Sequence, residues 1–190
     1  MKMTETTQSY YYLRRTPFGS VAVLWSVHRE QPKIWRTLLS KHRVSAKQLV
    51  QTYFPDLIPS SCTEVDLVAD EIAAFLTGED IQFSLGIARL DLCSKFQRRV
   101  LLAEYDIPWG SVSTYHRIAN HLGNAKGGRA VGRALATNPF PIIIPCHRTI
   151  RSDGTLGGYQ GGLEMKRALL KTEGILFDAS GRVTVKELFY

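Results

Sequence analysis

Cysteine is scarce in this sequence, and long hydrophobic runs are absent. The 190 residues include three cysteines, Cys62, Cys93 and Cys146. A small, odd number of cysteines argues against a disulfide framework and favours reduced thiols in a cytosolic protein. No stretch approaches the ~18 consecutive apolar residues of a transmembrane helix, and the opening MKMTETTQSYYYLRR lacks the apolar centre of a signal peptide. We therefore expect no membrane contact.

Metal-binding patterns are also missing. In the N-terminal part, His28, His42 and Cys62 are widely separated along the chain. Metal sites with these ligand types commonly use closely spaced pairs, so the sequence predicts no metal and no other cofactor. A site assembled in space from these distant residues remains the alternative.

The excess positive charge is confined to one part of the sequence. The net charge is +7, and the segment 98–171 accounts for all of it with 11 Lys and Arg against 4 Asp and Glu. Clustered positive charge favours a polyanionic partner, because each neutralised phosphate releases counterions. A solvated basic surface that maintains solubility is the alternative, and charge alone favours nucleic acid by a small margin.

Residues 1–90 have the pattern of a small α/β domain with an antiparallel sheet. Three segments have strand character, and the turn sequence TPFG separates the first two. Two helices follow, one that Ser45 can cap and one that Gly78 ends. We recognise no catalytic constellation here and interpret this domain as a scaffold. The expected strands are 10–15, 20–27 and 33–39, and the expected helices are 45–53 and 65–76.

Residues 91–190, beyond a boundary near 84–94, are predicted to be mainly helical. Ser94 and Gln97 fit a capping box, in which the serine accepts a free backbone N–H and the glutamine reaches back to the cap. The turn Gly123-Asn124 joins two further helices in the manner of a helix-turn-helix, although ordinary packing also produces such pairs. The expected helices are 94–105, 114–122 and 126–137.

The helix expected at 126–137 is rich in small residues. Each glycine costs ~1 kcal/mol in a helix interior, so the close approach of another surface has to compensate. DNA is one candidate for that surface, and a tightly packed neighbouring helix is the other. Arg129 and Arg133 lie four residues apart, roughly on one face. The small residues are Gly127, Gly128, Ala130, Gly132, Ala134 and Ala136.

The segment PFPIIIPCHRTI, residues 139–150, carries the clearest chemistry. Pro145 stiffens the chain immediately before Cys146, and His147 and Arg148 supply a base and a cation beside the thiol. Such neighbours lower a thiol pKa from ≈ 8.5 to roughly 3.5–7.5, so we expect an activated nucleophile. A buried cysteine is more often a small hydrophobic residue, and that is our interpretation of Cys62 and Cys93.

From Phe96 to Gly174 the sequence resembles the O6-alkylguanine-DNA alkyltransferases. The residues that carry the resemblance are FQRRVLLAEYDIPWG, STYHRIANHLGN, RAVGRALATNPFPIIIPCHR and GGYQGGLEMKRALLKTEG. The segment TPFGSVAVLWSV fits the variable N-terminal domain of that family more loosely. The resemblance implies an α+β protein in which the small N-terminal domain precedes a winged helix-turn-helix domain that carries the active-site cysteine.

The resemblance also implies a reaction and assigns its residues. Cys146 would accept an alkyl group, chiefly methyl, from O6 of guanine in a single irreversible turnover, with O4 of thymine as a further candidate substrate. His147 would act as a general base through a water molecule, and Glu173 would orient the imidazole. Tyr115 would serve N3 of the base, and Lys166 would help to polarise that tyrosine. Taken alone, Tyr115 fits core packing and Glu173 fits a solvated helix end.

DNA recognition follows from the same resemblance. The target base has to leave the duplex before the thiol can reach it, and Arg129 would fill the space that it vacates. The recognition helix would lie in the minor groove of double-stranded DNA, mostly against phosphates. Arg133 stands where some members have a small residue, and it would add a phosphate contact. The expected DNA-binding residues are Asn124, Tyr115, Arg129, Ala130, Gly132 and Arg133.

A pocket for the alkylated base is implied around the glycine-rich loop. Tyr159 and Pro141 would form its walls, and the backbone near Thr149 and Gln160 would bind the base. Gln160 replaces a smaller residue of some relatives, which leaves the width of the pocket open. Some members hold a structural zinc in the N-terminal domain, which the separated His and Cys residues above do not predict. The remaining pocket residues are Gly157 and Asn138, which would bind the turn between the helix-turn-helix and the cysteine motif.

Three other functions compete with this interpretation. A non-catalytic relative would bind alkylated DNA and recruit repair factors, but such relatives lack the acceptor cysteine. A DNA-binding regulator would leave the Pro-Cys-His-Arg turn unused, and a cysteine hydrolase would turn over without being modified. We expect a monomer, with clustering on DNA as an alternative, located in the cytoplasm at the nucleoid, or in the nucleus of a eukaryotic host.

Overall fold

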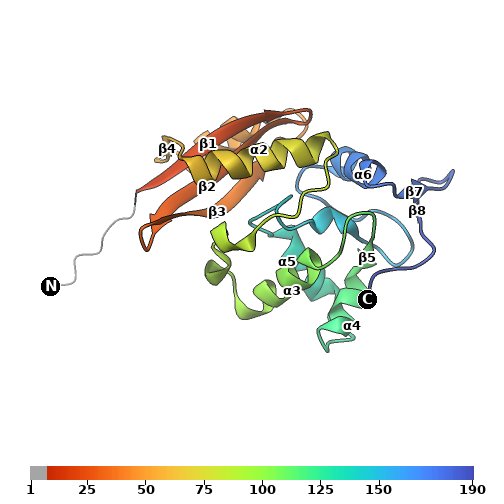
Figure 1. The fold of residues 1–190 in the computed structure, drawn as a ribbon. Coiled ribbons are helices and arrows are strands. Elements are labelled where there is room, and N and C mark those ends of the chain that lie inside the picture. The colour runs from red at the N-terminus through yellow and green to blue at the C-terminus, as the bar shows by residue number, and fades with distance from the viewer. Residues whose placement is uncertain (1–7) are drawn as a thin grey trace.

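A four-stranded sheet forms the N-terminal end of the fold in the computed structural model, which describes residues 8–190 (Figure 1). Its order is β3-β2-β1-β4. The three expected strands are confirmed as antiparallel neighbours, whereas the short β4, which the sequence did not predict, pairs parallel to β1. The strands are β1 Ser9–Thr16, β2 Gly19–His28, β3 Gln31–Leu39 and β4 Ile58–Pro59.

Helices cover both faces of this sheet. Successive residues of a strand point to opposite faces, and β2 is apolar in both sets. Val23 joins the cluster that includes Ile72 of α2 (Thr63–Thr77), and Leu24 joins the cluster that includes Val50 of α1 (Ala46–Tyr53). Since β2 is buried on both sides, its central residues form a continuous apolar run rather than an alternating one.

Both N-terminal helices begin or end where the sequence predicts. Ser45 accepts the backbone N–H of Gln48, and the Gln48 side chain accepts the backbone N–H of Ser45 at 2.8 Å, which completes a capping box at α1. At the C-terminal end of α2, Gly78 adopts a φ of 110°, a left-handed conformation that glycine adopts without strain.

The C-terminal part is built from short helices that surround the cysteine-bearing turn. After two 3-10 turns, η1 Leu85–Ile87 and η2 Leu90–Leu92, the chain forms four α-helices. The two-residue strands β5 and β6 pair in parallel, and β7 pairs with β8 in an antiparallel ribbon. The elements are α3 Lys95–Tyr105, β5 Ser113–Thr114, α4 Tyr115–His121, α5 Gly128–Ala136, η3 Cys146–Arg148, β6 Thr149–Ile150, α6 Leu163–Thr172, β7 Leu176–Phe177 and β8 Val183–Thr184.

The capping box predicted at Ser94 is half wrong. Ser94 Oγ accepts the backbone N–H of Gln97 at 3.2 Å, as expected. The Gln97 amide does not reach back, because it donates to the carbonyl oxygens of Ala134 and Thr137 at 3.2 and 3.1 Å, at the C-terminal end of α5. It thereby satisfies carbonyl groups that a helix end leaves without partners. The glutamine therefore ties α3 to α5.

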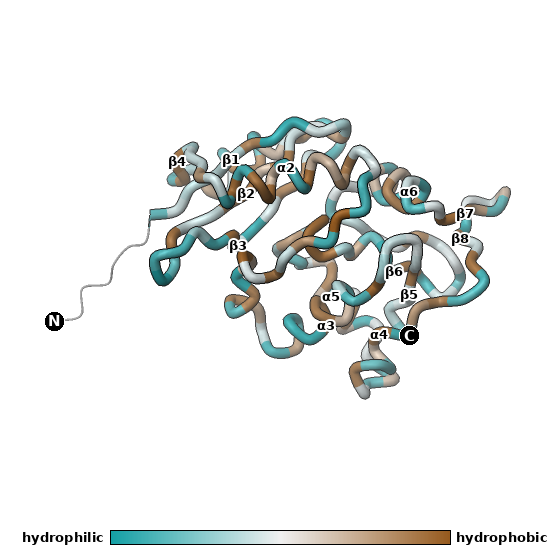
Figure 2. The backbone as a smooth tube through the Cα atoms, viewed as in Figure 1, coloured by the Kyte–Doolittle hydropathy of each residue, from teal (hydrophilic) through white to brown (hydrophobic). Residues whose placement is uncertain are grey.

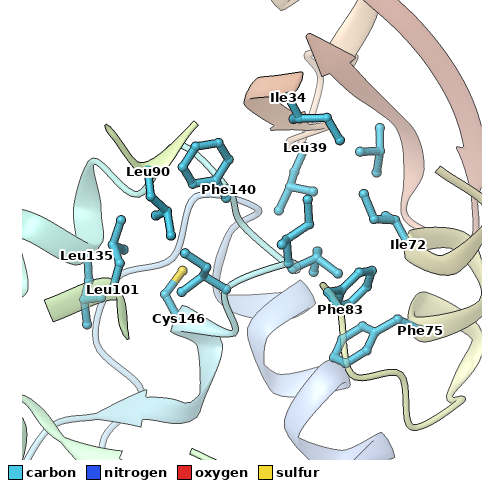
Figure 3. Close-up of a cluster of buried hydrophobic side chains, with 14 of the residues drawn as sticks. Ile34, Leu39, Ile72, Phe75, Phe83, Leu90, Leu101, Leu135, Phe140 and Cys146 are labelled. Atoms are coloured by element: carbon cyan, nitrogen blue, oxygen red, sulfur yellow. The ribbon is translucent and has the colours of Figure 1, made fainter. Parts of the chain in front are cut away.

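One hydrophobic cluster extends through both parts of the chain. It joins Ile34 and Ile72 of the N-terminal part to Leu101, Phe140 and Cys146 (Figure 3). Figure 2 shows that hydrophobic segments gather in the interior between the sheet and the helices, whereas the outer loops are mainly hydrophilic. The division into 1–90 and 91–190 remains a prediction, since this shared core crosses it.

Three further observations concern residues 8–190. No helix within this range combines the length and apolarity needed to cross a bilayer. No group of three or more His, Cys, Asp or Glu side chains in the same range is arranged to hold a metal ion. All three cysteines are free thiols, and burial raises the pKa of both Cys62 and Cys93.

Candidate active site

The turn that presents the cysteine is held by side chains from both parts of the chain. Asn138 Nδ2 donates to the carbonyl of Ile144 at 3.2 Å, and its Oδ1 accepts the backbone N–H of Phe140 at 2.9 Å. From β3, the N–H of Thr37 donates to the carbonyl of Pro139 at 2.8 Å and its hydroxyl to that of Pro141 at 3.1 Å. Asn138 therefore braces the turn before Cys146, as expected.

The Cys146 thiol is buried and protonated at rest. Only 6% of the residue is exposed, and burial raises the pKa of the thiol to about 12, with a further increase from the nearby carboxyl of Glu104. The Asn138 amide and the charge of Lys166 act in the opposite direction but are outweighed. The expectation that His147 and Arg148 lower this pKa is wrong, because both side chains are engaged with Glu173.

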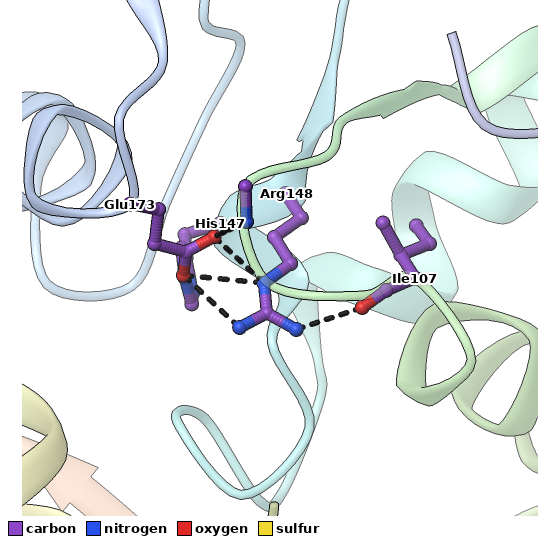
Figure 4. A network of polar contacts seen from close by, with 5 residues as sticks. Ile107, His147, Arg148 and Glu173 are labelled. Carbon is purple, nitrogen blue, oxygen red and sulfur yellow. Dashed lines mark hydrogen bonds and ion pairs between the residues drawn. The ribbon is translucent and has the colours of Figure 1, made fainter. Parts of the chain in front are cut away.

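A buried network joins His147, Arg148 and Glu173 (Figure 4). Nε2 of His147 lies 2.7 Å from Oε1 of Glu173, and Arg148 donates to both carboxylate oxygens, with Nε 2.9 Å from Oε2. The Nη1 atom of Arg148 donates to the carbonyl of Ile107 at 2.7 Å. Glu173 is thus a buried acceptor for two side chains rather than a solvated helix end.

This network fixes the protonation state of His147. Since the carboxylate accepts from Nε2, the proton of the neutral imidazole sits on Nε2 and the lone pair on Nδ1. Burial lowers the pKa of His147 despite its bond to Glu173, so the ring is neutral at pH 7. Although burial alone would raise the pKa of Glu173, the hydrogen bonds from His147 and Arg148 lower it. Within the described residues, Nδ1 of His147 has no protein partner.

A cavity of about 580 Å³ opens beside the thiol. Cys146, Tyr115 and Tyr159 line it together with Gly132 on α5 and Gln160 on the glycine-rich loop. Pockets of 300–1,000 Å³ are typical of sites for small organic ligands. Burial raises the pKa of Tyr115 to about 12 and that of Tyr159 well above its usual value, so both phenols keep their protons. The other lining residues are Lys41, His42, Leu135, Ala136, Gly158 and Gly162.

Gly157 lies directly against the hydroxyl of Tyr115. A Cβ atom at this glycine would sit 2.8 Å from Tyr115 Oη, and the residue has a φ of 68°. Both facts favour glycine here, since other residues rarely adopt this conformation and a side chain would displace the phenol. Gly157 thereby sets the position of the Tyr115 hydroxyl in the cavity.

Lys166 has a different partner from the one expected. Its ammonium, which is fully buried, donates to the carbonyl oxygen of Thr149 at 2.6 Å. Among the described residues no hydrogen bond joins it to Tyr115, so Lys166 does not polarise that hydroxyl by direct contact. The Thr149 carbonyl is correspondingly occupied by a protein donor.

Two other expected pocket residues contribute indirectly. Gln160 lines the cavity, but its amide donates to the carbonyl of Asn138 at 2.6 Å and so fastens the glycine-rich loop to the end of α5. Pro141 is buried under β3 and is not part of the cavity wall, because its carbonyl is turned toward Thr37. Tyr159 forms a wall, as expected, and its ring packs edge-on against His147 with centroids 6.0 Å apart.

The expected DNA-binding residues lie together around α4 and α5. Asn124, Arg129 and Arg133 are exposed, and Ala130 and Gly132 are half-buried. The sequence left two interpretations of the small residues, tight packing and the approach of another surface, and they fit different positions. A Cβ at Gly127 would lie 2.7 Å from the Asn124 amide, which shows close packing within the turn, whereas at Gly132 it would have room at 3.7 Å from the Tyr115 ring.

Sequence reasoning missed three residues of the site and assigned a different role to a fourth. Arg148, expected to act on the thiol, completes the buried network instead. Lys41 and His42 bring the N-terminal part to the cavity, although that part was interpreted as scaffold alone. Glu104 is fully buried near the thiol in the last turn of α3. Its only sequence indication is a charged residue on the helix face that also holds Leu101 and Ala103.

Comparisons with known proteins agree with this geometry. Residues 95–175 match the family described as 6-O-methylguanine DNA methyltransferase, DNA binding domain. The chain is 42% identical over 126 residues, 66% of its length, to the methylated-DNA–protein-cysteine methyltransferase of Methanothermobacter thermautotrophicus, and it covers 69% of that protein.

Solved structures give the same result over most of the chain. The O6-methylguanine methyltransferase of Mycobacterium tuberculosis aligns with a TM-score of 0.69 at 32% identity, over 87% of this chain and 93% of that one. A Mycobacterium tuberculosis structure of OGT in complex with DNA aligns with a TM-score of 0.68 at 30% identity, over 86% and 92% of the respective chains.

Proposed function

This chain belongs to the family of methylated-DNA–protein-cysteine methyltransferases, and we propose that it repairs DNA by moving an alkyl group, chiefly methyl, from O6 of guanine to its own Cys146. The observation that carries this proposal is the position of the thiol. It lies at the wall of a cavity shared with Tyr115 and Tyr159, beside a neutral imidazole that Glu173 orients. O4 of thymine offers the same leaving-group chemistry and is the second substrate to test.

The proposed reaction is a direct displacement. Sγ of Cys146 forms a bond to the alkyl carbon as the bond from that carbon to O6 breaks, and the electron pair passes to the guanine. The thiol proton moves through a water molecule to Nδ1 of His147, the nitrogen whose lone pair is free of Glu173. Tyr115 donates its proton to N3 of the departing base, and the proton held on His147 then passes to Tyr115, so that both side chains return to their neutral forms. The products are a thioether and neutral guanine.

The burial of the thiol gives this reaction a requirement. Since the pKa of Cys146 is raised to about 12 and that of His147 is lowered, neither group is charged at rest. Proton loss therefore has to accompany attack on a bound alkyl group rather than precede it. The thioether is uncharged and chemically stable, so each protein molecule acts once.

DNA binding supplies the base to the cavity. We propose that α5 lies in the minor groove and that Arg129 enters the stack as the alkylated base swings into the cavity. The support is the exposure of Arg129 on the helix whose Gly132 lines that cavity. Each chain carries a complete site, which supports action as a monomer at the genome, whether in a nucleoid or a nucleus.

Intact-protein mass spectrometry tests the proposal. Incubation with a duplex that contains O6-methylguanine should add one methyl group per chain, and peptide mapping should place it on Cys146. Cys146→Ala should gain no mass and still bind the duplex, whereas the matched control Cys62→Ser should be methylated as the wild type is. Repeated turnover without added mass would instead identify a hydrolase, and binding without loss of the lesion would identify a regulator or a recruiting protein.

A further inference from the structure

Glu104 is a carboxylic acid in a position that ordinarily holds an apolar residue. It has no solvent exposure, and it shares the inner face of α3 with Leu101. Its Oε2 accepts a hydrogen bond from the hydroxyl of Thr149, and Oε1 has no partner among residues 8–190. A buried carboxyl with an unsatisfied oxygen is costly, and the mechanism above makes no use of it.

The groups around Glu104 belong to the proposed active site. Lys166 approaches from α6 and Arg148 from η3, and the positive charge of both favours the ionised carboxyl. The helix that carries Glu104, α3, packs against η3, which begins at Cys146. The negative charge of Glu104 opposes the ionisation of both Cys146 and Tyr115. The negative charge of Glu104 also contributes to the raised pKa of Tyr190, the last residue of the sequence.

Thr149 connects this carboxyl to the lysine. Its hydroxyl donates to Glu104, and its carbonyl accepts from Lys166 Nζ at 2.6 Å. Thr149 follows directly on the turn that carries Cys146 and His147. Glu104, Thr149 and Lys166 therefore form a chain from α3 to α6 behind the nucleophile.

We propose, building on the function above, that Glu104 is a positioning residue that controls the ionisation of Cys146: the neutral acid permits the thiol to lose its proton during attack, and the carboxylate opposes that loss. The residue does not touch the alkyl group. It acts through the charge that it places behind the sulfur.

The direction of the effect follows from the order of the contributions. Desolvation, only partly offset by the Thr149 hydroxyl and Lys166, raises the pKa of Glu104 to about 7, so its charge changes within the physiological range. At Cys146 the increase in pKa due to Glu104 outranks the decrease due to Lys166. A variant without the carboxylate therefore gains thiolate, even though Lys166 loses part of the support for its own charge.

The test is the pH profile of Cys146 reactivity in Glu104→Gln and the wild type. We would measure alkylation of Cys146 by iodoacetamide and by O6-benzylguanine from about pH 6 to about pH 8.5, with peptide mapping to separate Cys146 from Cys62 and Cys93. The ratio of the variant rate to the wild-type rate should increase with pH. A one-unit decrease in the thiol pKa would give a ratio of about tenfold at the upper end.

Thr149→Val gives a second, independent outcome. Valine keeps the shape of the side chain but removes the hydrogen bond that lowers the pKa of Glu104. The carboxyl should then stay neutral to higher pH. The pH at which ionised Glu104 begins to slow alkylation of Cys146 should therefore be higher in Thr149→Val than in the wild type. A purely structural role would change the rates by a constant factor at every pH, and a flat or falling Glu104→Gln ratio would overturn the proposal.

Iodoacetamide also separates the two proposals. If O6-benzylguanine leaves the wild type unmodified while the iodoacetamide ratio increases with pH, the proposed function fails and the role of Glu104 stands. If both reagents modify Cys146 with a constant ratio, the function stands and the role of Glu104 fails.

Discussion

Nε2 of His147 lies 2.7 Å from Oε1 of Glu173, and both side chains are almost fully excluded from solvent. A hydrogen bond to a buried carboxylate holds the ring in one orientation and selects one tautomer. Arg148 approaches the same carboxylate from a second direction. One acidic side chain therefore orients the base and compensates a buried cation.

Glu173→Gln should lower both stability and the rate of alkyl transfer. The amide keeps the size of the side chain but leaves the Arg148 guanidinium without its counter-charge. Breaking a buried pair of this kind typically costs about 3–5 kcal/mol. Urea unfolding checks the loss of stability, with Glu164→Gln, an exposed position on α6, as the control. Equal unfolding midpoints for the two variants would contradict the buried network.

Stability should also respond to pH through Glu104. Because burial raises its pKa in the folded chain to about 7, the folded state binds more protons than the unfolded state between the usual carboxyl pKa and 7. Stability from this group is therefore complete below about pH 4.3 and is lost as the pH rises through 7. At pH 8, the free energy of unfolding of Glu104→Gln should exceed that of the wild type by on the order of 3 kcal/mol, and its melting temperature should be higher.

The difference between Glu104→Gln and the wild type should shrink as the pH falls toward 5. Thermal unfolding at several pH values measures it, with the exposed Glu71→Gln as a control whose difference stays constant. A wild type that is more stable than Glu104→Gln at pH 8 would show that the carboxylate is compensated in the fold.

Gly157→Ala should reduce alkyl transfer more than it reduces stability. The added methyl would lie 2.8 Å from Tyr115 Oη, at a φ of 68°, so the phenol has to move from its place in the cavity. The backbone strain amounts to roughly 1 kcal/mol. Transfer from free O6-benzylguanine and the melting temperature check the two effects. Gly123→Ala, at a φ of 78° with open space around the added methyl and outside the cavity wall, is the matched control: it carries a similar backbone strain but should react with free O6-benzylguanine like the wild type.

Arg129→Ala should separate duplex repair from the chemistry itself. The arginine is exposed on α5 and is not part of the cavity wall, so transfer from free O6-benzylguanine should be retained. Transfer from O6-methylguanine in a duplex should fall strongly, because extrusion of the base loses the side chain that fills its place. Arg15→Ala, an exposed arginine on β1, is the control. A similar loss with both substrates would refute the role of Arg129 in extrusion.

Local chemistry accounts for the parts of the fold that the sequence predicted well. Ser45, Gly78 and the TPFG turn act within a few residues of themselves, so their effects are visible without a tertiary structure. The same holds for the brace at Asn138, which bonds residues two and six positions ahead. The assignment of Glu173 came from the resemblance, and the structure supplies its physical basis.

Longer-range relationships were the ones that sequence reasoning got wrong or missed. Gln97 fits a local cap equally well, and only the arrival of α5 beside it decides the outcome. The pKa of Cys146 depends on how deeply the thiol is buried, and a neighbour in sequence such as Arg148 can point elsewhere. Lys166 and Glu104 are linked through Thr149, which no spacing along the chain reveals.

The two hydrogen bonds from Thr37 to Pro139 and Pro141 bear on how this protein can be recombined. They fasten β3 of the N-terminal sheet to the loop that leads to Cys146, across about a hundred positions of sequence. Grafting the first half of a homologue onto this second half would move the sulfur unless the donor strand offered a matching hydroxyl at the same depth. Substitutions on the two sides of this contact therefore depend on each other. Chimeras that combine the two parts from different homologues should be active only where both hydrogen bonds are kept.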